Sequence, residues 1–110
     1  MILAMAQQIL TTNGHQVIGL PSGDDLGINL VTLMPDIVIL DYFLPRITGR
    51  ELFKMIRSDA RGQGMAVIFL TAKPASELRE LSQEPRVTVL TKPLDPIRLV
   101  QAVNRALGFA

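Results

Sequence analysis

Three polar residues stand at or just after the ends of short apolar runs and are the strongest candidates for chemistry: Asp41, Thr71 and Lys92. They are thirty and twenty-one residues apart along the chain, so only the fold can bring them together. If the runs are parallel strands of an open sheet, their carboxyl ends share one edge, which is where such sheets bind ligands. A carboxylate, a hydroxyl and an ammonium group would then meet in one shallow site. They combine a candidate nucleophile with groups that hold an anion.

Apolar runs and helix-period segments alternate along the chain, which is typical of a parallel sheet covered by helices. The run Asp36–Leu40 is unbroken after its first acid and predicts a buried parallel strand. Asp95 and Pro96 supply a helix N-cap and a proline at the first helical position. We expect helices over residues 2–13, 26–34, 49–59, 75–83 and 96–107, strands over 15–20, 36–40, 65–70 and 87–90, and a loop over 61–64.

The length and composition restrict the kind of protein. The chain has 110 residues, 48% of them apolar, which fits a single domain over residues 1–110 with one substantial core. It has no cysteine, so disulfides, thiol chemistry and cysteine-bound metals are excluded. No apolar run approaches the length that spans a bilayer, and no basic run with interleaved aromatics indicates a nucleic-acid surface. We therefore expect a cytoplasmic domain that binds neither membrane nor nucleic acid.

The segments around the three polar residues match one known pattern. Asp41 is followed by Pro45 four residues later and by Gly49 eight residues later. Segments 69–72 (FLTA) and 90–94 (LTKPL) carry the threonine and the lysine. In order and spacing these motifs resemble the response-regulator receiver domains of two-component signalling, over essentially the whole chain. The resemblance implies an α/β fold, a flavodoxin-like doubly wound parallel sheet with helices on both faces, whose first strand is missing here.

The resemblance also implies a role for each residue. Asp41 would be the phosphoacceptor, whose carboxylate attacks the phosphorus of a phosphohistidine or a small phosphodonor and becomes an acyl phosphate. Lys92 would contact one phosphoryl oxygen, and the Thr71 hydroxyl would bond another and draw its loop inward as the signal. Mg²⁺ would be held by Asp41 and the backbone carbonyl of Phe43, among other ligands. The implied partner is a sensor histidine kinase or a phosphotransfer protein, and the domain is a switch and not an enzyme.

The sequence departs from this family at two places. Receiver domains begin with an apolar strand that ends in two acids, which hold Mg²⁺, whereas Met1 aligns near the start of the first helix. Losing two carboxylates weakens a site for a hard cation and disfavours Mg²⁺ binding and phosphorylation. Asp24 and Asp25, which follow the first expected strand, are candidates to replace those acids in part. Val89 stands where the family often has Tyr or Phe, so the ring that turns inward on activation is absent.

Several alternatives stay open. The missing strand fits a chain shortened by a late start codon, a partner chain that supplies the sheet element, or a degenerate receiver. The last would be an interaction module that works without phosphorylation. A phosphohydrolase of the haloacid dehalogenase type is disfavoured because Phe43 stands where that family needs a second aspartate. Residues 1–23 carry no charged side chain when His15 is neutral, so either a homodimer covers this segment or a monomer packs it into the gap.

Overall fold

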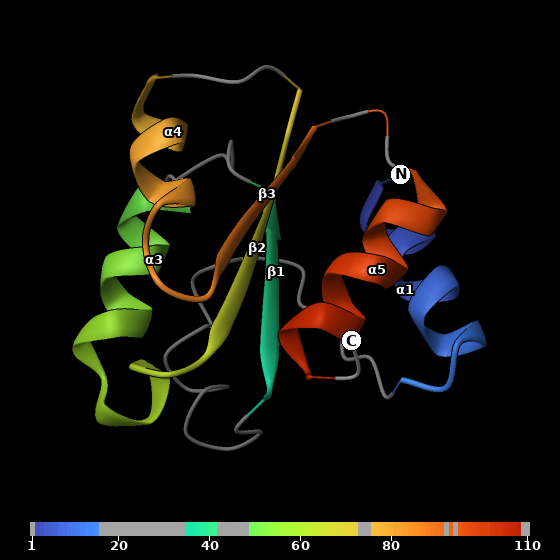
Figure 1. Cartoon of the computed structure of the whole chain (residues 1–110), viewed down its shortest axis with the longest axis horizontal. Coiled ribbons are helices and arrows are strands. Elements are labelled where there is room, and N and C mark those ends of the chain that lie inside the picture. The colour runs from blue at the N-terminus through green and yellow to red at the C-terminus, as the bar shows by residue number, and fades with distance from the viewer. Residues whose placement is uncertain are drawn as a thin grey trace.

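A computed structural model of the chain describes residues 2–15, 35–41, 49–72, 76–91, 93 and 95–108. Within these ranges helices and strands alternate, as Figure 1 shows. The strands are β1 (Ile37–Asp41), β2 (Ala66–Thr71) and β3 (Val87–Thr91). The helices are α1 (Ile2–Thr12), α3 (Gly49–Ser58), α4 (Ser76–Ser82) and α5 (Pro96–Ala106), with a short 3₁₀ helix η2 (Ala60–Gly62) after α3.

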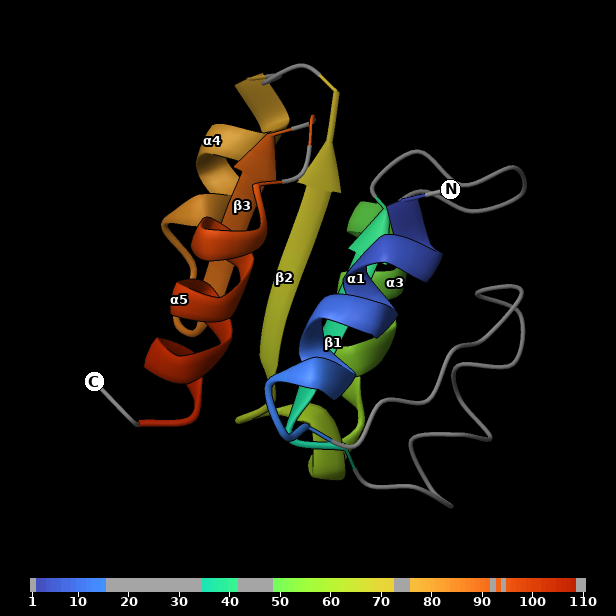
Figure 2. The same ribbon diagram turned by 90° about the vertical axis from the view of Figure 1, so that its right-hand side faces the viewer.

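The three strands form one parallel sheet in the order β1-β2-β3, which Figure 2 shows with β2 in the middle. Ile37 pairs with Ala66 at one end of the sheet, and Val67 pairs with Val87 on the other side of β2. Parallel neighbours need a crossover connection, and the segments that contain α3 and α4 provide the two crossovers. Every residue of β2 is buried, as a strand with neighbours on both edges and helices on both faces should be.

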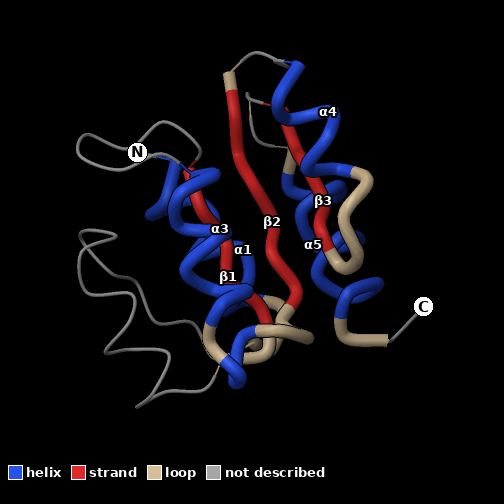
Figure 3. The backbone as a smooth tube through the Cα atoms, turned by 90° about the vertical axis from the view of Figure 1, so that its left-hand side faces the viewer, coloured by secondary structure: helices blue, strands red, loops and turns tan. Residues whose placement is uncertain are grey.

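Helices cover both faces of this sheet. Figure 2 looks onto the face that carries α1 and α5, and Figure 3 looks onto the face that carries α3 and α4. The alternation of side chains along β2 produces the two layers. Val67 and Phe69 pack in the cluster with α3 and α4, whereas Ile68 and Leu70 pack in the cluster with α1 and α5.

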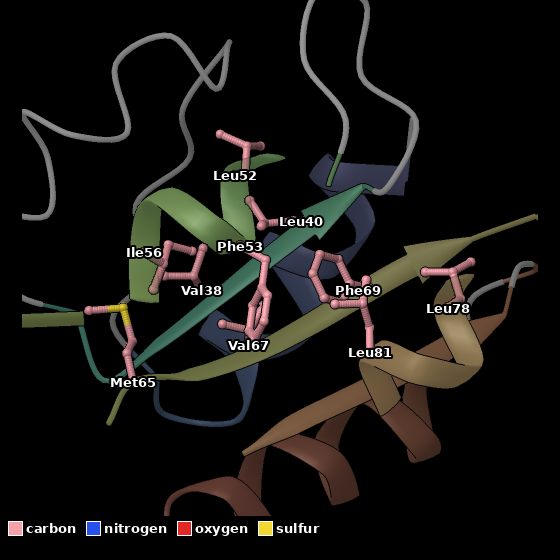
Figure 4. Close-up of a cluster of buried hydrophobic side chains, with 10 residues drawn as sticks. All are labelled: Val38, Leu40, Leu52, Phe53, Ile56, Met65, Val67, Phe69, Leu78 and Leu81. Atoms are coloured by element: carbon pink, nitrogen blue, oxygen red, sulfur yellow. The ribbon is translucent and has the colours of Figure 1, made fainter. Parts of the chain in front are cut away.

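The core beneath α3 and α4 is drawn in Figure 4 and follows from the helix period. Leu52, Phe53 and Ile56 are spaced to share one face of α3, and all three are buried. The rings of Phe53 and Phe69 meet edge to face, with centroids 6.1 Å apart. Such aromatic pairs add about 1 kcal/mol beyond the area they bury. Leu78 and Leu81 extend the same core under α4.

The second core joins the first and last helices of the chain to the sheet. Leu10 of α1 and Leu99 and Val103 of α5 are buried there against Leu70. The start of α5 is fixed by Asp95, whose Oδ1 accepts hydrogen bonds from the backbone N–H groups of Ile97 and Arg98 at 2.9 and 3.5 Å. The predicted cap therefore fixes the start of α5, which shares this core with the first helix, α1.

The described elements agree with the sequence prediction to within one or two residues, and two details differ. The expected loop over 61–64 begins inside η2. The strand predicted to be buried throughout is buried only at Val38 and Leu40, because Ile37 and Ile39 pack at the margin of the α1 and α5 layer. The expected helix over 26–34 and all but the first residue of the expected strand over 15–20 lie outside the described residues. No helix in the described ranges is long and apolar enough to cross a membrane.

Candidate functional site

The carboxyl ends of the three strands form one edge of the sheet, and two of the predicted site residues end strands there. Asp41 is the last residue of β1 and pairs with Leu70, the residue before Thr71. Thr71 ends β2 and pairs with Thr91, the last residue of β3. Neighbouring strands lie about 4.8 Å apart, so the register brings the backbones of Asp41 and Thr71 close together. The spacing of thirty residues in sequence thus becomes a short distance at this edge.

Thr71 is fully buried, and it is the one buried polar side chain found among the described residues. It follows Phe69 by two residues, so both side chains point to the α3 and α4 face of β2. A buried hydroxyl is held by its surroundings and does not meet a solvent-borne anion directly. Contact with a phosphoryl group therefore requires a rotation of this side chain or a movement of the chain after β2.

Several predicted residues fall outside the described ranges. Lys92 directly follows Thr91 in sequence, and Phe43 follows Asp41 by two residues; neither has a described position. The same holds for Asp24 and Asp25. For Asp41 the structure describes the backbone position, as the last residue of β1. The roles given to these residues stay predictions.

Receiver domains generally bind Mg²⁺ at their phosphorylation site, and the ion takes about six oxygen ligands in near-octahedral geometry. The described part of the chain holds no group of three or more acidic or histidine side chains that could hold a metal ion. The predicted ligands Asp41 and Phe43 would supply one carboxylate and one carbonyl. The side chains of these predicted ligands lie outside what the structure describes, so the magnesium site stays a prediction.

Arginines gather at the opposite, amino-terminal edge, which the sequence analysis did not single out. Arg57 of α3 donates from Nη1 to the carbonyl oxygens of Gly62 and Met65, both at 2.8 Å, and from Nη2 to that of Pro85 at 3.1 Å. Burial lowers the pKa of Arg57, and the neighbouring Arg86 guanidinium lowers it further. No local pattern indicates these contacts, because Pro85 and Arg86 lie on a different connection of the fold.

Comparison with known proteins places the chain among signalling domains. The family model of the response regulator receiver domain matches residues 1–104. The protein PilH of Pseudomonas aeruginosa is 29% identical over 102 residues, which cover 91% of this chain and 84% of PilH. The phosphate regulon transcriptional regulatory protein PhoB of Klebsiella pneumoniae is 28% identical over 100 residues, which cover 90% of this chain but only 44% of PhoB. The chain thus spans less than half of that relative.

A solved structure bears out the fold. The chemotaxis protein CheY4 of Vibrio cholerae aligns with a TM-score of 0.86 over 96% of this chain and 88% of that chain, at 22% sequence identity. The parallel sheet with helices on both faces is therefore the flavodoxin-like arrangement expected from the sequence. With a family model that matches nearly its whole length, this chain belongs to the family of response-regulator receiver domains, the receiving modules of two-component signalling.

Proposed function

We propose that this receiver domain takes a phosphoryl group on Asp41 and signals through Thr71 and Lys92. The observation that carries the proposal is the strand register, because Asp41 and Thr71 end neighbouring parallel strands at one edge. Lys92 follows the last residue of β3, whose end lies at the same edge. Strand carboxyl ends are the binding edge of open parallel sheets. The proposed donors are a sensor histidine kinase or a phosphotransfer protein.

The proposed reaction is a simple displacement at phosphorus. A carboxylate oxygen of Asp41 forms a new P–O bond while the P–N bond of the donor phosphohistidine breaks. The imidazole leaves, and the phosphoryl group becomes an aspartyl phosphate. The Lys92 ammonium offsets part of the negative charge on the phosphoryl oxygens. Transfer is one turnover of a switch, so the domain is not proposed to be an enzyme.

The burial of Thr71 supports a signal that is transmitted by a conformational change. The alternation along β2 directs the side chain to the α3 and α4 face, and it has no exposed surface. A phosphoryl group on Asp41 offers a charged acceptor to the Thr71 hydroxyl, and a hydrogen bond to a charged group is worth about 1.5–3 kcal/mol. That gain is large enough to shift the population of two conformations by at least tenfold. The end of β2 and the chain that follows it are the proposed moving part.

A labelling experiment tests the proposal. The chain is incubated with radiolabelled acetyl phosphate and Mg²⁺, and label on the protein is measured. Asp41→Asn should abolish acid-stable, hydroxylamine-labile label. Asp36→Asn is the matched control, because Asp36 precedes the same strand at its other end and is exposed. Label that persists in Asp41→Asn, or that disappears in both variants, would contradict the assignment of Asp41.

A second function is a receiver that binds partners without phosphorylation. It is favoured by Val89 of β3, which stands where the family often has the aromatic ring that turns inward on activation. Titration with Mg²⁺ and with beryllofluoride, a mimic of the phosphoryl group, separates the two functions. Chemical-shift changes near Asp41 that saturate with both reagents support the phosphoacceptor. A spectrum that responds to neither supports the interaction module.

A further inference from the structure

An open depression of about 560 Å³ lies at the amino-terminal edge of the sheet, between the starts of β1 and β2 and the last turn of α5. Asp36, Met65 and Arg86, which directly precede the three strands, all line it. Arg105 and Leu107 line it from the end of α5. We call this feature the arginine depression. It is about five residues of strand away from the Asp41 edge, a separation of roughly 16 Å.

Two guanidinium groups reach the arginine depression from different parts of the fold. Arg86 precedes β3, and its Nη2 donates to the carbonyl oxygen of Ala106 at 3.1 Å, which holds it across the end of α5. Arg105 projects from the last turn of α5 and is exposed. Among the described residues no hydrogen bond or ion pair is found for the Arg105 side chain. Its guanidinium is therefore available to a ligand.

Arg86, which lines the arginine depression, also has an unusual backbone conformation. Its φ is 60°, a left-handed conformation that residues other than glycine, asparagine and aspartate rarely adopt. The Arg86 carbonyl accepts a hydrogen bond of 2.9 Å from the N–H of Val67, which ties this turn to β2. Strained backbone of this kind is often found at binding sites, where the surrounding structure enforces it.

The charges of the arginine depression favour an anion. Asp36 contributes one carboxylate against the two guanidiniums of Arg86 and Arg105. The Arg57 guanidinium nearby is already bonded to three carbonyl oxygens, and its pKa is lowered by burial and, to a smaller extent, by Arg86, while Glu84 raises it. The net balance at the arginine depression is therefore positive.

We propose that the arginine depression docks an acidic peptide segment of a partner protein. The planar guanidiniums of Arg86 and Arg105 match the fork geometry of a carboxylate, which they can bind with paired hydrogen bonds. The half-buried Leu107 offers apolar contact beside them, and the volume of about 560 Å³ exceeds what a single small ion fills. Because it lies at the edge opposite Asp41, this docking does not require the phosphotransfer proposed above. Its test is therefore independent of the labelling experiment.

The proposal is tested by an NMR titration of the whole 110-residue chain. The probe is a short acetylated peptide that alternates glutamate with leucine, and its glutamine counterpart is the control ligand. Saturable shifts are expected at residues 36, 64–65, 86 and 105–108 for the acidic peptide alone. Arg105→Gln should weaken binding about tenfold, the effect of one charge-assisted contact. Arg79→Gln removes the same charge from an exposed position of α4 and should leave the affinity unchanged.

Five outcomes overturn the proposal. Shifts that map to the Asp41 edge place the peptide elsewhere, and equal weakening by Arg105→Gln and Arg79→Gln shows a nonspecific charge effect. Equal binding of inorganic phosphate at the same concentration shows a simple anion site. An oligomer at titration concentrations that buries Arg105 shows that a second copy covers the arginine depression. Arg86→Lys keeps the charge but removes the planar guanidinium with its paired N–H donors. It should weaken peptide binding severalfold, and an unchanged affinity contradicts the paired contact.

Discussion

The guanidinium carbon of Arg57 lies 4.8 Å from the centre of the Phe53 ring, four residues earlier on α3. The same guanidinium donates to the carbonyl oxygens of Gly62, Met65 and Pro85. One side chain thus joins α3 to the turn before β2 and to the turn before β3. These turns set where two of the three strands begin, so Arg57 helps to fix the register that aligns Asp41 with Leu70.

Arg57→Ala should lower the free energy of unfolding by about 2–4 kcal/mol, because three carbonyls lose a charged donor and Phe53 loses its cation. Arg57→Lys keeps the charge but supplies a single point donor, so it should recover less than half of the loss. Urea denaturation measures both. Arg79→Ala on the exposed face of α4 is the control and should change stability by less than about 0.5 kcal/mol. Equal effects at positions 57 and 79 would show that the Arg57 contacts contribute nothing.

Gly62→Ala should be strongly destabilising because a methyl group at this position has no room. An ideal Cβ at Gly62 would lie 2.1 Å from the carbonyl oxygen of Ile56, which belongs to the backbone of α3 and cannot move aside. We expect a loss on the order of 2–4 kcal/mol, typical of a forced backbone shift. Gly64→Ala is the matched control, since nothing lies within 4 Å of its Cβ. Thermal melts of both variants decide the matter, and similar midpoints would contradict the predicted clash.

Asp95→Ala should cost about 1 kcal/mol of stability through the loss of the cap on α5. Asp95→Asn keeps a side-chain oxygen for the N–H of Ile97 and should remain within a few tenths of wild type. The exposed pair of Asp95 with Arg98, at 3.9 Å, contributes little by comparison. Chemical denaturation separates the cap from the ion pair: Arg98→Ala should be nearly neutral. A cost at Asp95→Asn as large as at Asp95→Ala would assign the effect to charge instead.

Thr71→Val should leave Asp41 able to accept a phosphoryl group. The modification should then no longer change the conformation of the rest of the sheet. The substitution replaces a buried hydroxyl by a methyl group, so a stability cost of about 1 kcal/mol is expected. With beryllofluoride, wild type should show shifts that extend into β3, whereas the variant should show them only near Asp41. Thr88→Val, on the half-buried strand β3, is the control and should respond like wild type. Chemical-shift changes that extend into β3 in Thr71→Val, as in wild type, would show that Thr71 does not transmit the signal.

The local features of this protein could be predicted from its sequence because they depend on neighbours along the chain. Apolar runs separated by helix-period segments place β1, β2 and β3 to within about a residue of their ends. Asp95 and Pro96 mark the start of α5, since a cap and its helix are contiguous. That Asp41 and Thr71 end parallel strands follows from the same pattern, and so does their place at one edge of the sheet.

Other features are decided by packing between segments that the sequence pattern does not relate. The pairing of Asp41 with Leu70, the full burial of Thr71 and the half-burial of Ile37 depend on which strands and helices lie side by side. The contacts of Arg57 with Pro85 and of Arg86 with Ala106 join residues 28 and 20 positions apart. A periodic pattern records which face of an element is apolar, but not which distant carbonyl a long side chain can reach. The reach of these arginines, and the depression that Arg86 lines, exist only once the helices have packed on the sheet.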